Sequence, residues 1–194
     1  MTEKLKYAII GAGCMGQEHI LNIEIIDDAE VVALCDTSEK SIKESLDLLN
    51  NDVAIFDNYI DLVEANIADA FIIATPNFTH IEVLKEVMKS EAHLLIEKPL
   101  CTTVKDCQEF EKLAVDYPGV IWTAMEYRYM PPVQRMIKEI HNKTIGDLKM
   151  LSIREHRFPF LHKVDDWNRF AIKTGGTLVE KCCHFFDLMR LIAQ

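Results

Sequence analysis

Short apolar runs alternate, over the first 125 residues, with longer segments in which apolar side chains recur every three or four positions. Such short runs are typical of buried parallel strands, and the longer spacing is typical of amphipathic helices. The pattern predicts strands over residues 6–10, 30–36, 53–56, 69–75, 93–98 and 120–125. It predicts helices over 16–26, 38–50, 78–90 and 103–115. This alternation indicates an α/β fold, a Rossmann-type doubly wound parallel sheet.

The pattern changes near residue 125. Two consecutive prolines, Pro131 and Pro132, predict the first turn of a helix, because proline is tolerated there. The segments expected after residue 125 are a helix over 130–142, a strand over 146–158, a polar and aromatic loop over 158–174 and a glycine-started helix over 175–194. We therefore expect two domains: residues 1–125 form the doubly wound sheet, and residues 126–194 begin an α+β domain.

Composition excludes several classes of partner. The chain has 194 residues, 49% hydrophobic and 27% charged, with a net charge of −10. It contains no basic stripe or arginine-rich tract, which argues against nucleic acid and anionic membranes. The apolar run near the N-terminus is too short for a signal peptide, and no stretch reaches the roughly 20 apolar residues that span a bilayer. We expect a cytoplasmic location.

Cysteine spacing argues against a structural metal site. The sequence has no C-x-x-C pair, and its six cysteines are Cys14, Cys35, Cys101, Cys107, Cys182 and Cys183. Zinc sites and disulfide frameworks usually show recognisable pairings. We expect reduced, partly buried thiols, as in a cytoplasmic protein, and no metal.

The sequence GAGCMG follows the first strand and opens the first helix, with Gly11, Gly13 and Gly16 in the order G-x-G-x-x-G. In a dinucleotide site the first glycine permits a tight turn, the second lets the backbone approach the pyrophosphate, and the third allows close helix–strand packing. Cys14 and Met15 belong to this cofactor-binding loop, and we expect them to pack rather than react. The alternative is a glycine turn that binds nothing.

Asp36 ends the second strand, 20 residues after Gly16. An acid at this position accepts hydrogen bonds from both ribose hydroxyls and repels a 2′-phosphate, which favours NAD over NADP. The alternative is that Asp36 only caps the following helix.

Two further strands end in polar residues at the sheet edge where open α/β sheets bind ligands. The fourth strand ends in ATPNFTH, which places Thr75, Pro76, Asn77 and His80 there as candidate cofactor contacts. The alternatives are that Asn77 caps the following helix and that His80 is a surface residue in its first turn. The fifth strand ends in Glu97, Lys98 and Pro99. A lysine beside an apolar core is unfavourable unless it is paired or functional, so we count Glu97 and Lys98 as site residues.

The chain resembles the glucose–fructose oxidoreductase, inositol dehydrogenase and MocA family over essentially its whole length. The motifs that carry the resemblance are, in order, the glycine loop, ATPN…H and EKP. The family's second signature resembles GGTLVEKCCHFFD, which contains Gly175, Gly176, Glu180, His184 and Asp187. Residues four apart share a helical face, so we expect Glu180 and His184 to face one cleft. Two departures are Glu180 where aspartate is usual and Cys182 where glycine is common.

The resemblance implies an NAD-dependent dehydrogenase that oxidises a secondary alcohol of a sugar, inositol or related polyol. His184 would take the hydroxyl proton, with a pKa suited to neutral pH, and Lys98 would stabilise charge on the oxygen. Glu180 would be the third catalytic residue, either orienting His184 or contacting substrate. The alternative for His184 is a structural histidine in an apolar helix.

Substrate contacts are expected from the region after residue 125. In addition to Lys98 and His184, the candidates are Tyr127, Arg157, Trp167 and Asp187. Further polar candidates are Arg154, His156, Arg169 and Lys173, for which surface ion pairs are the alternative. Tyr127, Arg128 and Tyr129 either line the cleft or pack the joint between the domains.

The resemblance also implies a larger second domain, built on an antiparallel sheet, than the roughly 70 residues after position 125 can form. We expect the chain to lack most of that domain, and a homo-oligomer only where the sheet is complete. One alternative function is a truncated, non-catalytic remnant that binds nucleotide or a partner. Another is chemistry in which bound NAD is used transiently, without net NADH.

Overall fold

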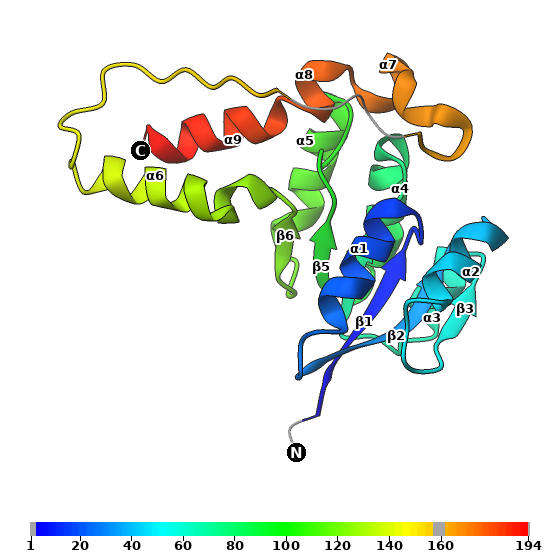
Figure 1. The fold of residues 1–194 in the computed structure, drawn as a ribbon. Coiled ribbons are helices and arrows are strands. Elements are labelled where there is room, and N and C mark those ends of the chain that lie inside the picture. Colours follow the sequence, from blue (N-terminus) through cyan, green and yellow to red (C-terminus); the bar gives the residue numbers. More distant parts are fainter. Residues whose placement is uncertain (1–2, 157–161, 194) are drawn as a thin grey trace.

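The computed structural model describes residues 3–156 and 162–193. Its centre is a parallel sheet of six strands in the order β3-β2-β1-β4-β5-β6 (Figure 1). The strands are β1 (Leu5–Ile10), β2 (Ala29–Cys35), β3 (Ala54–Phe56), β4 (Ala70–Ile73), β5 (His93–Ile96) and β6 (Ile121–Thr123). From β1 the chain adds β2 and β3 on one side, and then β4, β5 and β6 on the other. The strand order therefore reverses between β1 and β4, and the doubly wound fold and all six predicted strands are confirmed.

Helices cover both faces of this sheet. They are α1 (Cys14–Ile23), α2 (Glu39–Leu46), α3 (Tyr59–Glu64), α4 (His80–Val87) and α5 (Val104–Ala114). Neighbouring strand residues point to opposite faces: Ile9 belongs to the core that includes Ile20 of α1, and Ile10 to the core that includes Leu84 of α4. The near-continuous apolar strands therefore reflect burial on both sides. The four predicted helices are confirmed, and α3 was not predicted, because six residues are too short to show a period.

Side-chain caps explain where some of these helices begin. Ser38 Oγ accepts a hydrogen bond from the Ser41 N–H at 3.2 Å before α2. Thr103 Oγ1 accepts one from the Asp106 N–H at 3.1 Å before α5. Such caps satisfy N–H groups that have no partner inside the helix.

The chain after β6 forms short helices and two longer ones that contact each other (Figure 1). They are η2 (Glu126–Tyr129), α6 (Pro131–His141), η3 (Val164–Arg169), α7 (Ala171–Thr174), α8 (Thr177–Glu180) and α9 (Cys183–Ile192). The predicted helix over 130–142 is confirmed, with proline in its first turn. Within the expected loop over 158–174, the described residues include η3 and α7. The domain boundary after residue 125 stays a prediction.

The predicted strand over 146–158 is wrong. Residues 148–156 have no regular secondary structure, and residues 157 and 158 lie outside the described part of the chain. Mixed polarity alone does not form a strand, because the backbone also needs a neighbouring strand to bond with. All strands among the described residues belong to the parallel sheet, and none pairs with this segment.

The single helix predicted over 175–194 is also wrong. The Lys181 and Cys182 N–H groups both donate to the Thr177 carbonyl, at 3.0 and 3.1 Å. This shared acceptor breaks the regular series of i→i−4 bonds, so α8 ends at Glu180 and α9 begins at Cys183.

None of the described helices is long and apolar enough to cross a membrane. The cytoplasmic location stays a prediction. All six thiols are free, and Cys35 and Cys101 are buried.

Replacing Gly16 by alanine should destabilise the fold. The added Cβ would lie 2.1 Å from the Gly11 carbonyl oxygen and 3.2 Å from Ile9 Cγ2, so the helix must shift away from β1. We expect the free energy of unfolding, measured in urea, to fall by about 1–3 kcal/mol. Gly13→Ala is the matched control, because its Cβ would meet no atom within 4 Å. Equal losses in both variants would contradict this account.

Candidate active site

The glycine loop is tightly packed on one side and open on the other. Gly11 has φ +99°, and a Cβ there would lie 2.5 Å from the Ala74 carbonyl carbon at the end of β4. Gly13 precedes α1 and has open space where a Cβ would be. The backbone at Gly13 can therefore be approached by a ligand, and the N-terminus of α1 offers unpaired N–H groups.

Cys14 and Met15 are exposed in the first turn of α1, with 37% of Met15 accessible. The expectation that they pack is therefore wrong. Gly16 alone occupies the inner side of this turn, against the Gly11 backbone.

Asp36 links the glycine loop to the turn before α2. Its Oδ2 accepts a hydrogen bond from the Ala12 N–H and its Oδ1 one from the Ser38 N–H, both at 2.8 Å. Ser38, not Asp36, is the capping residue of α2, so the capping alternative is wrong. A carboxylate oxygen can accept more than one hydrogen bond, so both Asp36 oxygens can also accept hydrogen bonds from ribose hydroxyls.

Asn77 is the buried polar residue at the end of β4. Asn77 is only 6% exposed, and its side-chain Nδ2 has no hydrogen-bond partner among the described residues. Pro76, rather than Asn77, precedes η1 (Asn77–Thr79), so the capping alternative is wrong here as well. A buried amide without a partner is unfavourable, and a bound ligand with a carbonyl or hydroxyl would satisfy it. Neighbouring Thr75 accepts a hydrogen bond from Thr79 Oγ1 at 2.8 Å.

His80 joins the ends of β4 and β5. Its Nε2 lies 3.0 Å from the Thr75 carbonyl oxygen and its Nδ1 3.0 Å from the Pro99 carbonyl oxygen. The residue is fully buried, and burial lowers its pKa. The surface alternative is therefore wrong, and contact of His80 with a cofactor stays a prediction. His80 also joins the two loops that carry Asn77 and Lys98.

Glu97 is buried and paired with a residue that the sequence did not indicate. Its Oε1 lies 2.8 Å from His19 Nε2, in α1, and its Oε2 accepts a hydrogen bond from the Lys98 N–H at 3.3 Å. His19 thus ties α1 to the end of β5. Only its place in the helix after the glycine loop could have indicated this role.

Lys98 is half-buried and followed by a cis peptide bond to Pro99. Within the part of the chain that the structure describes, its ammonium group forms no ion pair or hydrogen bond. Its positive charge nevertheless reaches the second signature: it acts on Glu126, Cys183 and His184. The lysine at the end of the apolar strand therefore faces groups from the C-terminal part.

His184 is almost fully enclosed. It is 1% exposed, its Nε2 lies 3.4 Å from Glu126 Oε1, and its Nδ1 has no hydrogen-bond partner among the described residues. The Tyr127 ring stacks on it, with centroids 4.1 Å apart and planes 6° apart. Burial, followed by the charges of Lys98 and Lys181, lowers the pKa of His184 to about 4. The expectation of a pKa near neutrality is wrong: the ring is neutral at pH 7 and a weaker base than ordinary histidine.

Tyr127 is held by two charged residues that the sequence analysis missed. Its hydroxyl donates to Glu155 Oε1 at 2.6 Å and accepts a hydrogen bond from Lys181 Nζ. Lys181 Nζ also lies 3.1 Å from Glu155 Oε2. A lysine inside the apolar tract LVEKCCHFF was the available signal, since lysine is rarely buried without a partner.

The other acidic candidates of the second signature are Glu180 and Asp187. Glu180 ends α8 and His184 lies in α9, so the break removes their expected i, i+4 relation. Both Asp187 oxygens accept hydrogen bonds from the Arg128 guanidinium, which ties α9 to η2. Both elements follow residue 125, so this ion pair lies within the expected second domain and does not test whether Arg128 packs the joint between the domains.

Three further candidates, Trp167, Arg169 and Lys173, lie on η3 and α7, and α7 contacts η1. The Trp167 ring packs edge-on against Phe78, with centroids 6.5 Å apart, and Lys173 Nζ lies 5.4 Å from the Phe78 ring centroid. Arg169 pairs with Asp166 at 3.5 Å, a surface ion pair as the alternative foresaw. Arg157 lies outside the described residues.

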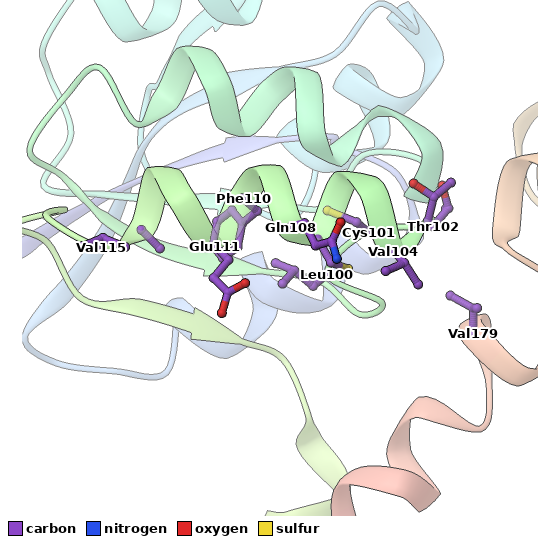
Figure 2. A pocket seen from close by; sticks show the side chains of 12 residues that line it. Leu100, Cys101, Thr102, Val104, Gln108, Phe110, Glu111, Val115 and Val179 are labelled. Carbon is purple, nitrogen blue, oxygen red and sulfur yellow. The ribbon is translucent and has the colours of Figure 1, made fainter.

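A separate apolar groove of about 660 Å³ follows α5 and the loop before it, with Val179 as the one lining residue from α8. Figure 2 shows Val104 and Gln108 on α5, with Val179 of α8 beyond the end of that helix. None of the candidate catalytic residues lines it. Among the described residues no group of three or more histidine, cysteine or acidic side chains could hold a metal.

The lowered pKa of His184 predicts a pH-dependent stability. Between pH 6.5 and about 4 the unfolded chain binds a proton at this histidine that the folded chain does not. The contribution of His184 to the free energy of unfolding is therefore complete above pH 6.5 and is lost as the pH falls toward 4. We expect the free energy of unfolding to fall by about 3 kcal/mol over this range. Urea unfolding at pH 7 and 4 should show this loss in the wild type and a correspondingly smaller one in His184→Gln; the same pH dependence in both would contradict the lowered pKa.

The comparisons with known proteins agree with this geometry. Residues 5–125 match the profile of an oxidoreductase family with an NAD-binding Rossmann fold, and residues 137–193 that of its C-terminal alpha/beta domain. The rhizopine catabolism protein MocA of Rhizobium meliloti is 25% identical over 96% of this chain and 56% of its own length. Myo-inositol 2-dehydrogenase of Thermotoga maritima is 26% identical over 97% of this chain and 54% of its own.

Among solved structures, GenD2 from gentamicin A biosynthesis, in complex with NAD, has the same fold. It has a TM-score of 0.82 at 18% identity, over 100% of this chain and 54% of its own. The chain thus spans about half the length of these relatives. The resemblance carried by the glycine loop, EKP and the second signature is confirmed: the chain belongs to the glucose–fructose oxidoreductase, inositol dehydrogenase and MocA family of oxidoreductases.

Proposed function

We propose that this protein, or the longer protein that contains this chain, is an NAD-dependent oxidoreductase. Its substrate would be a secondary alcohol of a sugar, inositol or related polyol, the class to which myo-inositol belongs. One observation carries the proposal. Lys98 at the end of β5 and His184 in α9 come from distant parts of the chain, yet the Lys98 ammonium lies close enough to lower the pKa of His184.

The residues around the glycine loop fit NAD. The open space at Gly13 and the N-terminus of α1 suit the pyrophosphate, and the Asp36 carboxylate suits the ribose hydroxyls. The unpartnered Asn77 amide is a donor at the edge where the nicotinamide half belongs. NAD, when bound, supplies the hydride acceptor.

The protein's own contribution is to move one proton and to stabilise one charge. Oxidation of a secondary alcohol breaks the C–H bond with its electron pair and the O–H bond as a proton. His184 is neutral at pH 7 and can accept that proton, while the Lys98 ammonium donates a hydrogen bond to the oxygen as negative charge develops. Glu180 remains a proposed third member of the site. Tyr127 and Trp167 remain proposed substrate contacts, whereas Asp187 is occupied by Arg128.

A second candidate function is nucleotide binding without turnover. The 1% exposure of His184 beneath Tyr127 favours it, because a substrate hydroxyl cannot reach the imidazole in this arrangement. Turnover would then require the Tyr127 ring to move aside. A homo-oligomer stays a prediction.

NADH should raise the thermal midpoint of the chain more than NADPH does. A ligand that binds only the folded state stabilises it, by about 2.7 kcal/mol at 100 times its Kd. Asp36→Asn keeps one acceptor oxygen but removes the charge, so the NADPH shift should grow relative to the NADH shift. Asp116→Ala, at an exposed site in the turn after α5, should leave the preference unchanged. An unchanged preference in Asp36→Asn would contradict the role of Asp36.

Lys98→Met and His184→Gln should each lower kcat by about 10²–10⁴-fold, because each removes a group that acts on the reacting oxygen. The measurement is NADH formation with myo-inositol as the probe polyol. Each variant should retain the NADH-induced thermal shift, and Lys112→Met, an exposed lysine on α5, should retain the rate as well. Undiminished turnover in Lys98→Met and His184→Gln would overturn the catalytic assignment. NADH binding without turnover in the wild type would favour the second candidate.

A further inference from the structure

Lys181 lies at the break between α8 and α9, and its side chain is 9% exposed. Its ammonium group has two partners. It donates a hydrogen bond to the Tyr127 hydroxyl and pairs with Glu155 Oε2 at 3.1 Å. The same ammonium lies 4.6 Å from the centroid of the Tyr127 ring. A buried charge is unfavourable unless it is paired and hydrogen-bonded, so these contacts hold Lys181 in one place.

The cluster of Lys181, Tyr127 and Glu155 closes on itself. The Tyr127 hydroxyl donates to Glu155 Oε1 at 2.6 Å, so each of the three side chains bonds to the other two. Hydrogen bonds to charged groups are stronger than neutral ones and are directional. These hydrogen bonds, in addition to packing, fix the orientation of the Tyr127 ring.

The fixed ring lies flat on His184, 4.1 Å away and 6° from parallel. We propose that Lys181 is a positioning residue of the active site: it clamps Tyr127, and Tyr127 then holds the His184 imidazole in a fixed, shielded orientation. Lys181 itself touches neither a reacting atom nor, through any described contact, the His184 ring. This inference rests on the proposed function for its catalytic meaning but not for its geometry.

The charges that face His184 come from four parts of the chain. Glu97 and Lys98 follow β5, Glu126 lies in η2, Lys181 lies between the two last helices, and Glu155 lies in the segment before residue 157. Lys98 and Lys181 both disfavour a protonated imidazole, whereas Glu97 and Glu155 favour it. Removing the Lys181 charge favours the protonated imidazole, and freeing Tyr127 makes His184 less buried. Both effects should therefore raise the pKa of His184.

The experiment compares His184 in the wild type and in Lys181→Met by NMR, following the imidazole protons as the pH is varied. In the wild type, the stacked Tyr127 ring should shift these protons upfield, and the pKa should be about 4. In Lys181→Met, the upfield shift should be lost and the pKa should rise toward 6.5. Lys181→Arg, which keeps the charge and donors, should restore both.

Lys112→Met is the matched control, since it removes one positive charge from an exposed position of α5. It should change neither readout. If Lys181→Met leaves both readouts as in the wild type, or if Lys112→Met alters them equally, the positioning role is overturned. If Lys181→Met does not fold, the same two readouts in Tyr127→Phe decide, because that variant keeps the ring and removes the hydroxyl that Lys181 holds.

These outcomes separate the inference from the proposed function. A changed His184 titration in a chain that never forms NADH would support the clamp and count against the dehydrogenase. If turnover depends on Lys98 and His184 but the His184 titration is unchanged in Lys181→Met, the dehydrogenase is supported and the clamp is overturned. In a chain that turns over, Lys181→Met should move the acidic limb of the kcat profile together with the His184 pKa.

Discussion

The His80 imidazole, buried between two backbone carbonyls, is the contact on which the proposed site depends. It lies 3.0 Å from the Thr75 carbonyl oxygen and 3.0 Å from that of Pro99, so it spans the ends of β4 and β5. Asn77 follows the first of these strand ends and Lys98 the second. Leu100 adds a third carbonyl oxygen, 3.3 Å from Nδ1, whereas a neutral imidazole has only one N–H, and burial lowers its pKa. In the neutral ring only one nitrogen can donate, so packing must contribute to holding the other side. The adjacent pair of His19 and Glu97 fixes the same edge from α1.

Electrostatics rather than shape distinguishes the site from the rest of the surface. The groove along α5 has a mostly apolar lining, and none of the candidate catalytic residues lies in it. Lys98, Glu126 and Lys181 instead bring charge close to the buried His184. Burial first, and then the charges of the two lysines, lower the pKa of this histidine and keep it neutral. A neutral imidazole beside an ammonium is the pairing that proton removal and oxyanion stabilisation require, and it exists before any ligand is present.

The sequence predicted the fold well because local and long-range signals agree in its first 125 residues. Apolar runs such as FII in β4 are buried on both faces, and Gly11 and Gly16 stand where backbone atoms lie within about 3 Å of an added Cβ. The motif residues Gly11, Asp36, Asn77, Lys98 and His184 were found from order and spacing. What failed depended on partners far away in the chain. The strand over 146–158 was inferred from polarity without a neighbour to bond with, and His19 and Glu155 carry no local pattern that indicates their partners. The surface alternative for His80 failed because its burial depends on contacts with the ends of two strands, at Thr75 and Pro99, which no local pattern indicates.

The break at Lys181 connects these failures to function. A continuous helix over 175–194 would place Glu180 and His184 on one face, as the spacing suggested, but would keep Lys181 on a helical position about 100° around the axis from Glu180. In the structure, the Lys181 and Cys182 N–H groups share the Thr177 carbonyl, and the Lys181 side chain is buried beside Tyr127 and Glu155. Two charge-assisted contacts thus accompany the interrupted helical bonding at this point. Helix propensity is a weak local preference, of tenths of a kcal/mol per residue, and contacts of this kind are strong enough to override it. The departure from regular structure therefore coincides with the residue that holds Tyr127 over His184, and this is where a local reading of the sequence should be least reliable.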